Sequence, residues 1–143
     1  MIKRTKVSNI LYRSQYEANQ AKILIKEKIN FEYETKILEF AEPLRGGTCL
    51  DCGGSSVAKS RIYTTDFYFP DTNIFVELKG KFDSATRSKM RWVTEQCEED
   101  VRMVFMRDNY LSRKHKMTYS RWCEINGITF SIGNIPLEWC RNV

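Results

Sequence analysis

Apolar and polar positions form their clearest pattern in the middle of the chain, between residues 63 and 80. Residues 63–69 are rich in aromatic and β-branched side chains, and residues 74–80 form a second, largely apolar run. The Pro-Asp-Thr-Asn sequence at 70–73 between them is typical of a turn. Together these three stretches predict a β-hairpin.

The N-terminal third predicts a helix followed by extended chain. Ser14-Gln15-Tyr16-Glu17 fits a capping box, in which Ser14 is the N-cap and Glu17 is the third helical residue. The helix is expected to run to about Lys28, with Glu17 on the edge that faces the core. Residues 30–40 alternate aromatic with acidic positions and are expected to form one strand or two short ones.

The rest of the chain adds shorter elements around the hairpin. Its pattern predicts a helix, a strand, a second helix, a short edge strand and a closing turn, at residues 83–97, 101–106, 118–126, 128–130 and 136–139. Residues 41–60, which contain many glycines and serines, are expected to be an irregular bridge or loop. This order of elements predicts an α/β fold with a central mixed β-sheet flanked by helices.

Length and composition bound the class of protein. With 143 residues, 42% hydrophobic and 29% charged, the chain suits one globular domain over residues 1–143. It has no apolar run long enough to cross a bilayer and no signal-peptide core, which predicts a cytoplasmic protein whose five cysteines are reduced. The cysteines and tryptophans of the second half are expected to be core residues: Cys97, Cys123, Cys140, Trp92, Trp122 and Trp139.

The chain has a net charge of +5 and two basic stretches, of which the second alone accounts for the whole excess. Residues 1–13 carry four basic side chains and no acid, and residues 102–121 carry six against Asp108 alone. Clustered cations suit a polyanionic substrate such as DNA or RNA, and the same charges could instead form a solvated surface. Because acids that could bind a metal ion lie on the predicted hairpin, a nucleic-acid substrate is favoured over a merely solvated surface.

Two acids and a lysine are expected to converge on the hairpin. Because side chains alternate between the faces of a strand, Glu77 and Lys79 share one face while Val76 and Leu78 occupy the other. Asp66 enters from the partner strand. Burying these acids is costly without compensation, which favours a divalent cation such as magnesium between Asp66 and Glu77. The alternative is a Glu77–Lys79 ion pair on a solvated strand face.

The acids and the lysine resemble the motif of the PD-(D/E)xK nuclease superfamily. The motif combines a glutamate on the first helix with an aspartate and a Glu-x-Lys on a hairpin. In this chain Thr65 replaces the proline that precedes the aspartate. The wider sequence resembles one narrower group, the phage endonuclease I family of Holliday-junction resolvases. The stretches that carry this resemblance, in the family's order and spacing, are Arg13-Ser14, Phe31-Glu32-Tyr33-Glu34, residues 63–67, residues 74–80, Arg102-Met103-Val104-Phe105 and Ile135-Pro136-Leu137-Glu138-Trp139. The resemblance covers nearly the whole chain except residues 41–60.

The resemblance implies a restriction-endonuclease-like core and a metal-dependent endonuclease that cleaves branched DNA, especially four-way junctions, by paired incisions. Asp66 would then bridge two magnesium or manganese ions. Glu77 and the Leu78 carbonyl would hold one ion, and Glu17 would help to hold the other. Lys79 would orient the attacking water or offset charge in the transition state. The implied catalytic residues are Glu17, Asp66, Glu77 and Lys79.

The resemblance also implies an intertwined homodimer in the cytoplasm of a phage-infected bacterial host. The first helix of one subunit would complete the active site of the other, so that Glu17 acts in trans, and a symmetric dimer suits paired incisions. Basic residues are expected to contact DNA phosphates by charge. The expected contacts are Lys3, Arg4, Lys6, Arg13, Arg87, Lys89, Arg107, Arg113, Lys114, His115 and Lys116.

Residues 41–60 depart from the family's pattern by their length and by the sequence Cys49-Leu50-Asp51-Cys52. This spacing is half of a zinc-ribbon or zinc-knuckle signature, and the other half is missing nearby. Two reduced thiols in a loop are the favoured interpretation. The competitor is one four-thiolate zinc site that Cys49 and Cys52 of both subunits share across the dimer axis.

Two other functions stay open on the sequence alone. A nuclease of the same superfamily could cut linear duplex DNA in restriction or repair, although 143 residues show no separate recognition domain. A non-catalytic module could bind branched DNA without cutting it. A module of that kind would be expected to lack one or more of the catalytic residues. All four are present in this chain: Glu17, Asp66, Glu77 and Lys79.

Overall fold

A computed structural model describes residues 5–43, 58–114 and 116–142. Five of the predicted functional residues lie outside the described residues: Lys3, Arg4, Cys49, Cys52 and His115. Lys6 belongs to the first strand and is described in its backbone alone. What the sequence predicts for these six side chains stays a prediction.

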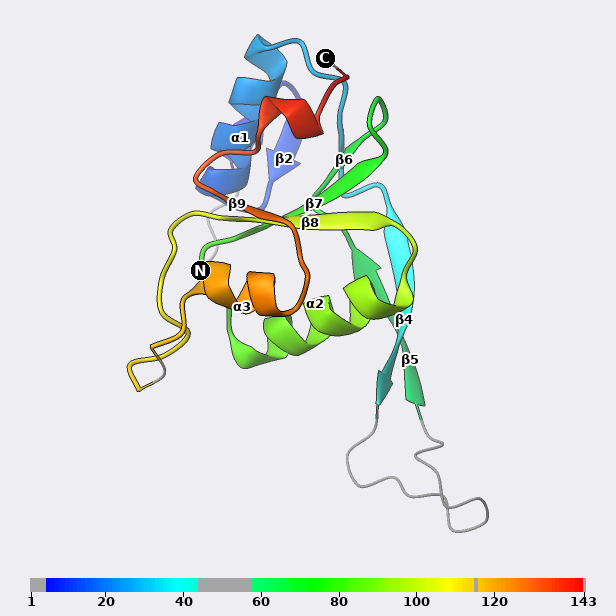
Figure 1. The fold of residues 1–143 in the computed structure, drawn as a ribbon. Coiled ribbons are helices and arrows are strands. Elements are labelled where there is room, and N and C mark those ends of the chain that lie inside the picture. The colour runs from blue at the N-terminus through cyan, green and yellow to red at the C-terminus, as the bar shows by residue number, and fades with distance from the viewer. Residues whose placement is uncertain (1–4, 44–57, 115, 143) are drawn as a thin grey trace.

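Five strands form a central mixed β-sheet in the order β3-β6-β7-β8-β9 (Figure 1). The strands are β3 (Glu32–Tyr33), β6 (Phe67–Phe69), β7 (Ile74–Lys79), β8 (Asp100–Phe105) and β9 (Phe130–Ile132). β3, β6 and β7 are antiparallel neighbours, whereas β8 and β9 run parallel to β7. The predicted α/β class with a mixed sheet is therefore confirmed.

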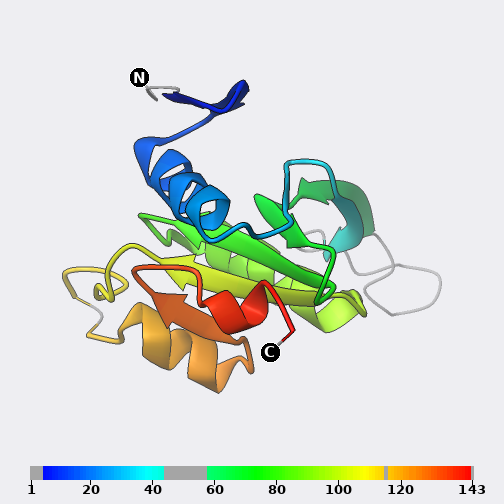
Figure 2. The ribbon, with the colours of Figure 1, turned by 90° about the horizontal axis from the view of Figure 1, so that it is seen from above.

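Helices cover both faces of this sheet (Figure 2). They are α1 (Gln15–Lys26), α2 (Ser84–Gln96), α3 (Tyr119–Ile125) and the 3-10 helix η1 (Leu137–Trp139). α1 and η1 lie over one face, where they pack on Val76 and Leu78, and α2 and α3 lie over the other, where they pack on Phe75. Alternation along β7 thus separates two hydrophobic cores.

The capping box predicted at Ser14 is present at the start of α1. The Ser14 hydroxyl oxygen accepts a hydrogen bond from the Glu17 N–H (3.2 Å), and this hydroxyl also lies 3.0 Å from Glu17 Oε2, to which it donates. The helix ends at Lys26 rather than at Lys28, because Lys28 adopts the left-handed backbone (φ 57°). The other two helices begin within one residue of the starts predicted for them, at Ser84 and Tyr119.

The predicted hairpin is present, but its first strand is shorter than predicted. β6 begins at Phe67, and the preceding residues 58–64 form β5 (Ala58–Thr64), which belongs to a different sheet. Thr65 and Asp66 carry the chain from β5 to β6, and the Thr65 N–H donates a hydrogen bond to the Lys36 carbonyl (3.1 Å). A proline at position 65 could not donate this bond.

A second hairpin corrects the prediction for residues 41–60. β4 (Ile37–Pro43) pairs antiparallel with β5 over its whole length, from Ile37 opposite Thr64 to Pro43 opposite Ala58. Residues 41–43 and 58–60 are therefore strand rather than irregular chain. The pairing partner is distant in sequence, and that contact overrides the local composition from which the irregular loop was predicted.

The sequence pattern does not predict the N-terminal hairpin. β1 (Thr5–Val7) and β2 (Ile10–Tyr12) are antiparallel strands joined by Ser8 and Asn9, both with positive φ (46° and 69°). Two consecutive left-handed residues suit the tight turn of a two-residue hairpin. The strands are too short for a recognisable alternation of apolar and polar residues, which explains why this hairpin was not predicted.

The C-terminal segment holds α1 in place. Gln20 donates a hydrogen bond to Asn134 Oδ1 (2.8 Å) and accepts one from the Ile135 N–H (2.9 Å), 115 positions later in the chain. The Tyr16 hydroxyl donates to the Gly133 carbonyl (2.7 Å). Because Gln20 is buried, these bonds satisfy a polar group that would otherwise destabilise the core.

The predicted core residues of the second half divide into two groups. Cys123, Cys140 and Trp139 are buried, as predicted. Cys97, Trp92 and Trp122 are partly buried and pack at the edge of the core beneath α2 and α3. Within the described ranges, every helix is too short or too polar to cross a membrane.

Candidate active site

One cavity collects all four residues that were predicted to be catalytic. It has a volume of about 730 Å³ and lies where the N-terminus of α1, the crossing from β5 to β6 and the C-terminal end of β7 meet. Its walls include Glu17, Asp66, Glu77 and Lys79. Segments far apart in the sequence therefore build one polar site at the end of the sheet.

Asp66 is fixed by the backbone on both sides of it. Its carboxylate Oδ2 accepts a hydrogen bond from the Leu78 N–H (2.8 Å), just beyond the last paired residue of β6 and β7. Its carbonyl accepts one from the Glu34 N–H (2.9 Å). Burial, followed by the charges of Glu77 and Glu17, raises the pKa of Asp66 well above its usual range. A positive charge near this carboxylate would therefore be strongly favoured.

Glu77 and Lys79 lie on the same side of β7, as the alternation predicts. Lys79 Nζ lies 3.5 Å from Glu77 Oε1. This pair differs from the ion pair of a solvated strand face, because Glu77 is only 4% exposed. Burial raises the pKa of Glu77, and the charge of Lys79 opposes that rise. The buried Glu77 carboxylate and the partly exposed Lys79 ammonium group thus form a charge pair that faces the cavity.

Tyr63 is a further partner of Glu77, and no role was predicted for it. The Tyr63 hydroxyl donates a hydrogen bond to Glu77 Oε2, and both side chains are buried. Burial, followed by the charge of Glu77, raises the pKa of Tyr63, so that the phenol stays protonated and remains a donor. Each carboxylate oxygen of Glu77 therefore has its own partner in the protein.

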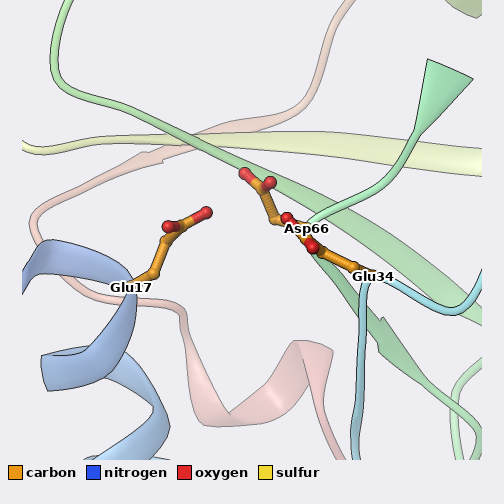
Figure 3. Close-up of side chains that lie close together, drawn as sticks. All are labelled: Glu17, Glu34 and Asp66. Carbon is orange, nitrogen blue, oxygen red and sulfur yellow. The ribbon is translucent and has the colours of Figure 1, made fainter. Parts of the chain in front are cut away.

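Three carboxylates approach one another on the α1 side of the cavity (Figure 3). Oxygen atoms of Glu17, Glu34 and Asp66 all lie within 4.8 Å of one another. Glu17 comes from the first turn of α1, and its carboxylate points toward Asp66 in the close-up. A set of hard oxygen donors this close together fits a divalent cation such as magnesium or manganese.

Glu34 is the acid that the sequence analysis missed as a site residue. It follows β3, adopts the left-handed backbone (φ 54°) and forms an ion pair with Arg13 (2.7 Å). The sequence offered one weak signal, because Glu34 belongs to a stretch shared with the nuclease family. Its approach to Asp66 depends on the pairing of β3 with β6, which joins residues far apart in sequence.

The backbone carbonyl of Leu78 also fits the predicted role of a ligand. In an extended strand the N–H and C=O of one residue point to the same side. Since the Leu78 N–H is directed at Asp66, the carbonyl of this residue is directed toward the same edge of β7. Both groups of Leu78 thus face the side from which Asp66 approaches.

Some of the basic residues predicted to contact DNA line the cavity, and others lie away from it. Arg13 and Lys89 line it, as does Lys81, which the sequence analysis did not select. Arg87 does not line the cavity and instead donates to the Phe82 carbonyl (2.6 Å) at the start of α2. Four others are exposed on the loop between β8 and α3: Arg107, Arg113, Lys114 and Lys116.

Comparison with known proteins shows the family to which the chain belongs. The sequence profile described as phage endonuclease I matches residues 1–143. The chain belongs to the phage endonuclease I family. Endonuclease I of Escherichia phage T7 is 34% identical over 132 residues, which cover 91% of this chain and 78% of that protein. Endodeoxyribonuclease 1 of Enterobacteria phage T3 is 32% identical over 128 residues, covering 88% and 74%.

Membership of the phage endonuclease I family confirms the family resemblance and the enzyme class predicted from the sequence.

Proposed function

We propose that the protein is a metal-dependent endodeoxyribonuclease that resolves four-way DNA junctions by paired phosphodiester hydrolysis. One observation carries this proposal: Glu17, Asp66, Glu77 and Lys79 line one cavity in a member of the phage endonuclease I family. The names of the T7 and T3 relatives, an endonuclease and an endodeoxyribonuclease, support DNA as the substrate.

The acids divide into two overlapping sets of ligands for magnesium or manganese. Asp66, Glu77 and the Leu78 carbonyl would hold one ion, and Asp66 with Glu17 would hold a second. Two such ions stabilise the attacking and the leaving oxygens of an in-line displacement when they are bound. The burial of Asp66 and Glu77 supports this assignment, because buried carboxylates without a counter-ion are unfavourable.

Lys79 has a role that is distinct from those of the acids. Its ammonium group is partly exposed and reaches the cavity beside Glu77. When the cations balance the acids, this ammonium is free to hold the attacking water or to offset the negative charge that develops on the phosphate. The oxygen of water forms a bond to phosphorus while the bond between phosphorus and the leaving oxygen breaks. The attacking water loses a proton to solvent, and the leaving oxygen takes one up from solvent to become a hydroxyl group.

Cations along the cavity would hold the DNA backbone next to the acids. Arg13 is fixed by its ion pair with Glu34, and Lys81 and Lys89 lie on the walls of the same cavity. Contacts of this kind bind phosphates without reading bases. The exposed cations of the loop between β8 and α3 would extend this contact along a DNA arm, which gives a salt-dependent affinity.

We further propose that the enzyme works as an intertwined homodimer. Ile37 and Ile62 lie diagonally across β4 and β5, and both are exposed (58% and 66%). Exposed isoleucines on a paired strand face support a protein contact there. In the described chain Glu17 approaches Asp66 of the same chain. Exchange of the N-terminal segment between two subunits would keep this contact and change only the chain that supplies it.

Mixed dimers test whether Glu17 acts in trans. Glu17→Ala and Asp66→Ala subunits carrying different tags are produced together, and the mixed dimer is isolated. If Glu17 acts in trans, one site of that dimer has both substitutions and the other has none, so it nicks one strand of the junction. If Glu17 acts in cis, both sites lack one acid, and the mixed dimer is inactive.

The proposed function is tested on a fixed four-way junction and on a linear duplex with the same arm sequences, with magnesium. Symmetric incisions near the junction centre, with the linear duplex intact, are expected. Equal cutting of both substrates would favour a nuclease for linear duplex. Binding of the junction without cutting, in magnesium and in manganese, would favour a non-catalytic binding module.

A further inference from the structure

Tyr63 stands out among the residues that line the cavity, because it is buried and yet contacts an acid of the site. It lies near the end of β5, is 3% exposed, and packs in the core beneath α2. Its hydroxyl donates to Glu77 Oε2. A phenol has few rotatable bonds, so a tyrosine held by core packing places its hydroxyl with little freedom.

Glu77 needs such a partner more than the other acids do. Asp66 has a short side chain and is tied to the Leu78 N–H. Glu77 has a longer side chain, and its other oxygen faces Lys79 at 3.5 Å. That lysine is flexible and partly exposed, so it restrains the carboxylate only weakly. Among the described contacts, Tyr63 is thus the rigid partner that fixes the direction of Glu77.

The position of Tyr63 in the chain connects the two acids. Residues 63–66 run from the end of β5 to the start of β6, so one short segment carries Tyr63 and Asp66. The ammonium group of Lys89 on α2 lies 4.8 Å from the centre of the Tyr63 ring and restrains the ring further. Asp66 and the partner of Glu77 are therefore positioned by the same short segment.

We propose that Tyr63 is a positioning residue for Glu77. The hydrogen bond from Tyr63 orients one carboxylate oxygen of Glu77, and the carboxylate is thereby held in the orientation that binds a divalent cation. This inference rests on the proposed function, since it assigns Tyr63 to the cation site of the nuclease. Partners that orient a ligand commonly change metal affinity 10–100-fold when they are removed. Tyr63 itself is not expected to touch DNA or the cation.

The test compares Tyr63→Phe with wild type and with a matched variant, Tyr68→Phe. Tyr68 is also on a strand of this region, but its hydroxyl donates to Asn73 (2.8 Å), away from the acids. Manganese affinity is measured by calorimetry without DNA. We expect Tyr63→Phe to bind manganese about 10-fold more weakly or worse and Tyr68→Phe to bind it like wild type.

A second background separates positioning from general loss of structure. In Glu77→Gln protein the ligand that Tyr63 orients is already changed, so adding Tyr63→Phe should not weaken the remaining manganese binding further. An equal loss in both backgrounds would overturn the inference and make Tyr63 a purely structural residue. Junction binding in calcium and the thermal transition of each variant show whether the fold is kept.

The outcomes also distinguish this inference from the function on which it rests. If wild-type protein binds no manganese and cuts no junction, the proposed function fails. If wild-type protein binds manganese and Tyr63→Phe binds it equally well, the proposed function stands and the role of Tyr63 is overturned. For a positioning role, the magnesium concentration at half-maximal rate should also rise in Tyr63→Phe, with the affinity for the junction unchanged.

Discussion

The Leu78 N–H donates a hydrogen bond to the carboxylate of Asp66, so a side chain continues the hydrogen-bond ladder where β6 has not yet begun. This bond fixes Asp66 against the strand that carries the other acid of the motif. Spacing along the sequence allows Asp66 and Glu77 to meet, and the Leu78 backbone holds one of them in place. The acids of the site are thus attached to the sheet itself.

Removal of an acid or of the lysine should separate cutting from binding. We expect Glu77→Gln and Lys79→Ala each to reduce the rate of junction cleavage by a factor on the order of 1,000 or more. Cleavage is followed on gels with magnesium, and affinity is measured by gel shift in calcium, where it should be nearly unchanged. Glu95→Gln, an exposed acid of α2, is the matched control and should cut normally. Loss of binding along with cutting would make Glu77 and Lys79 structural residues.

Asp66→Asn should stabilise the metal-free protein at neutral pH. The pKa of Asp66 in the folded state lies well above its ordinary value of 3.8, because of burial and neighbouring acids. A raised pKa means that the folded state holds this proton more tightly than the unfolded state does. The associated stability is present below the ordinary pKa and is lost as pH rises through the folded pKa.

Metal-free wild-type protein should therefore lose stability as pH rises from about 4 toward neutrality, and Asp66→Asn should lose less. The expected gain for the variant at neutral pH is on the order of 1–3 kcal/mol. Urea denaturation in chelator across this pH range measures it. Asp71→Asn, a change at an exposed aspartate, serves as the control. Parallel pH profiles for wild type and Asp66→Asn would contradict the prediction.

Divalent cations should stabilise the folded protein through the same acids. A cation that binds only the folded state, at 100 times its dissociation constant, adds about 2.7 kcal/mol to the free energy of unfolding. We expect manganese to raise the thermal transition of wild type and chelator to reverse the rise. In Asp66→Asn the rise should be largely absent. An equal rise in both proteins would place the bound cation elsewhere.

Substitution of Thr65 should raise the stability of the protein, whereas most substitutions in a core lower it. Its hydroxyl is buried and has no hydrogen-bond partner among the described residues, so Thr65→Val should stabilise the protein by about 1 kcal/mol. Thr72→Val is the matched control, because the Thr72 hydroxyl donates to the Trp139 carbonyl and its loss should destabilise. Thermal denaturation of both variants measures whether each substitution raises or lowers the stability. Destabilisation by Thr65→Val would mean that its hydroxyl has a partner, such as a buried water.

Residues that act through local sequence could be predicted. Asp66, Glu77 and Lys79 fall within one predicted hairpin, where alternation along a strand decides which side chains share a face. Glu17 was found because the capping box fixes the start of its helix and because the family pattern places an acid there. The start of that helix followed from its cap, which is also a local signal, whereas its predicted end at Lys28 was two residues too late.

Residues that reach the site through distant pairing could not be predicted in the same way. Glu34 approaches Asp66 because β3 pairs with β6, and Tyr63 approaches Glu77 because the chain crosses from the end of β5 to β6, the neighbour of β7. Neither relation leaves a periodic signal in the sequence. The strands at 41–43 and 58–60 were missed for the same reason, since each is stabilised by the other.

The hydrogen bonds of Gln20 to Asn134 and Ile135 have a consequence for the order in which a ribosome makes the chain. The helix that carries Glu17 is synthesised before the hairpin, and the two partners of Gln20 follow 114 and 115 positions after it. A nascent chain can form the hairpin with Asp66 and Glu77 before Glu17 is held against it. The approach of Glu17 to Asp66 would then be secured only after Asn134 and Ile135 have been synthesised.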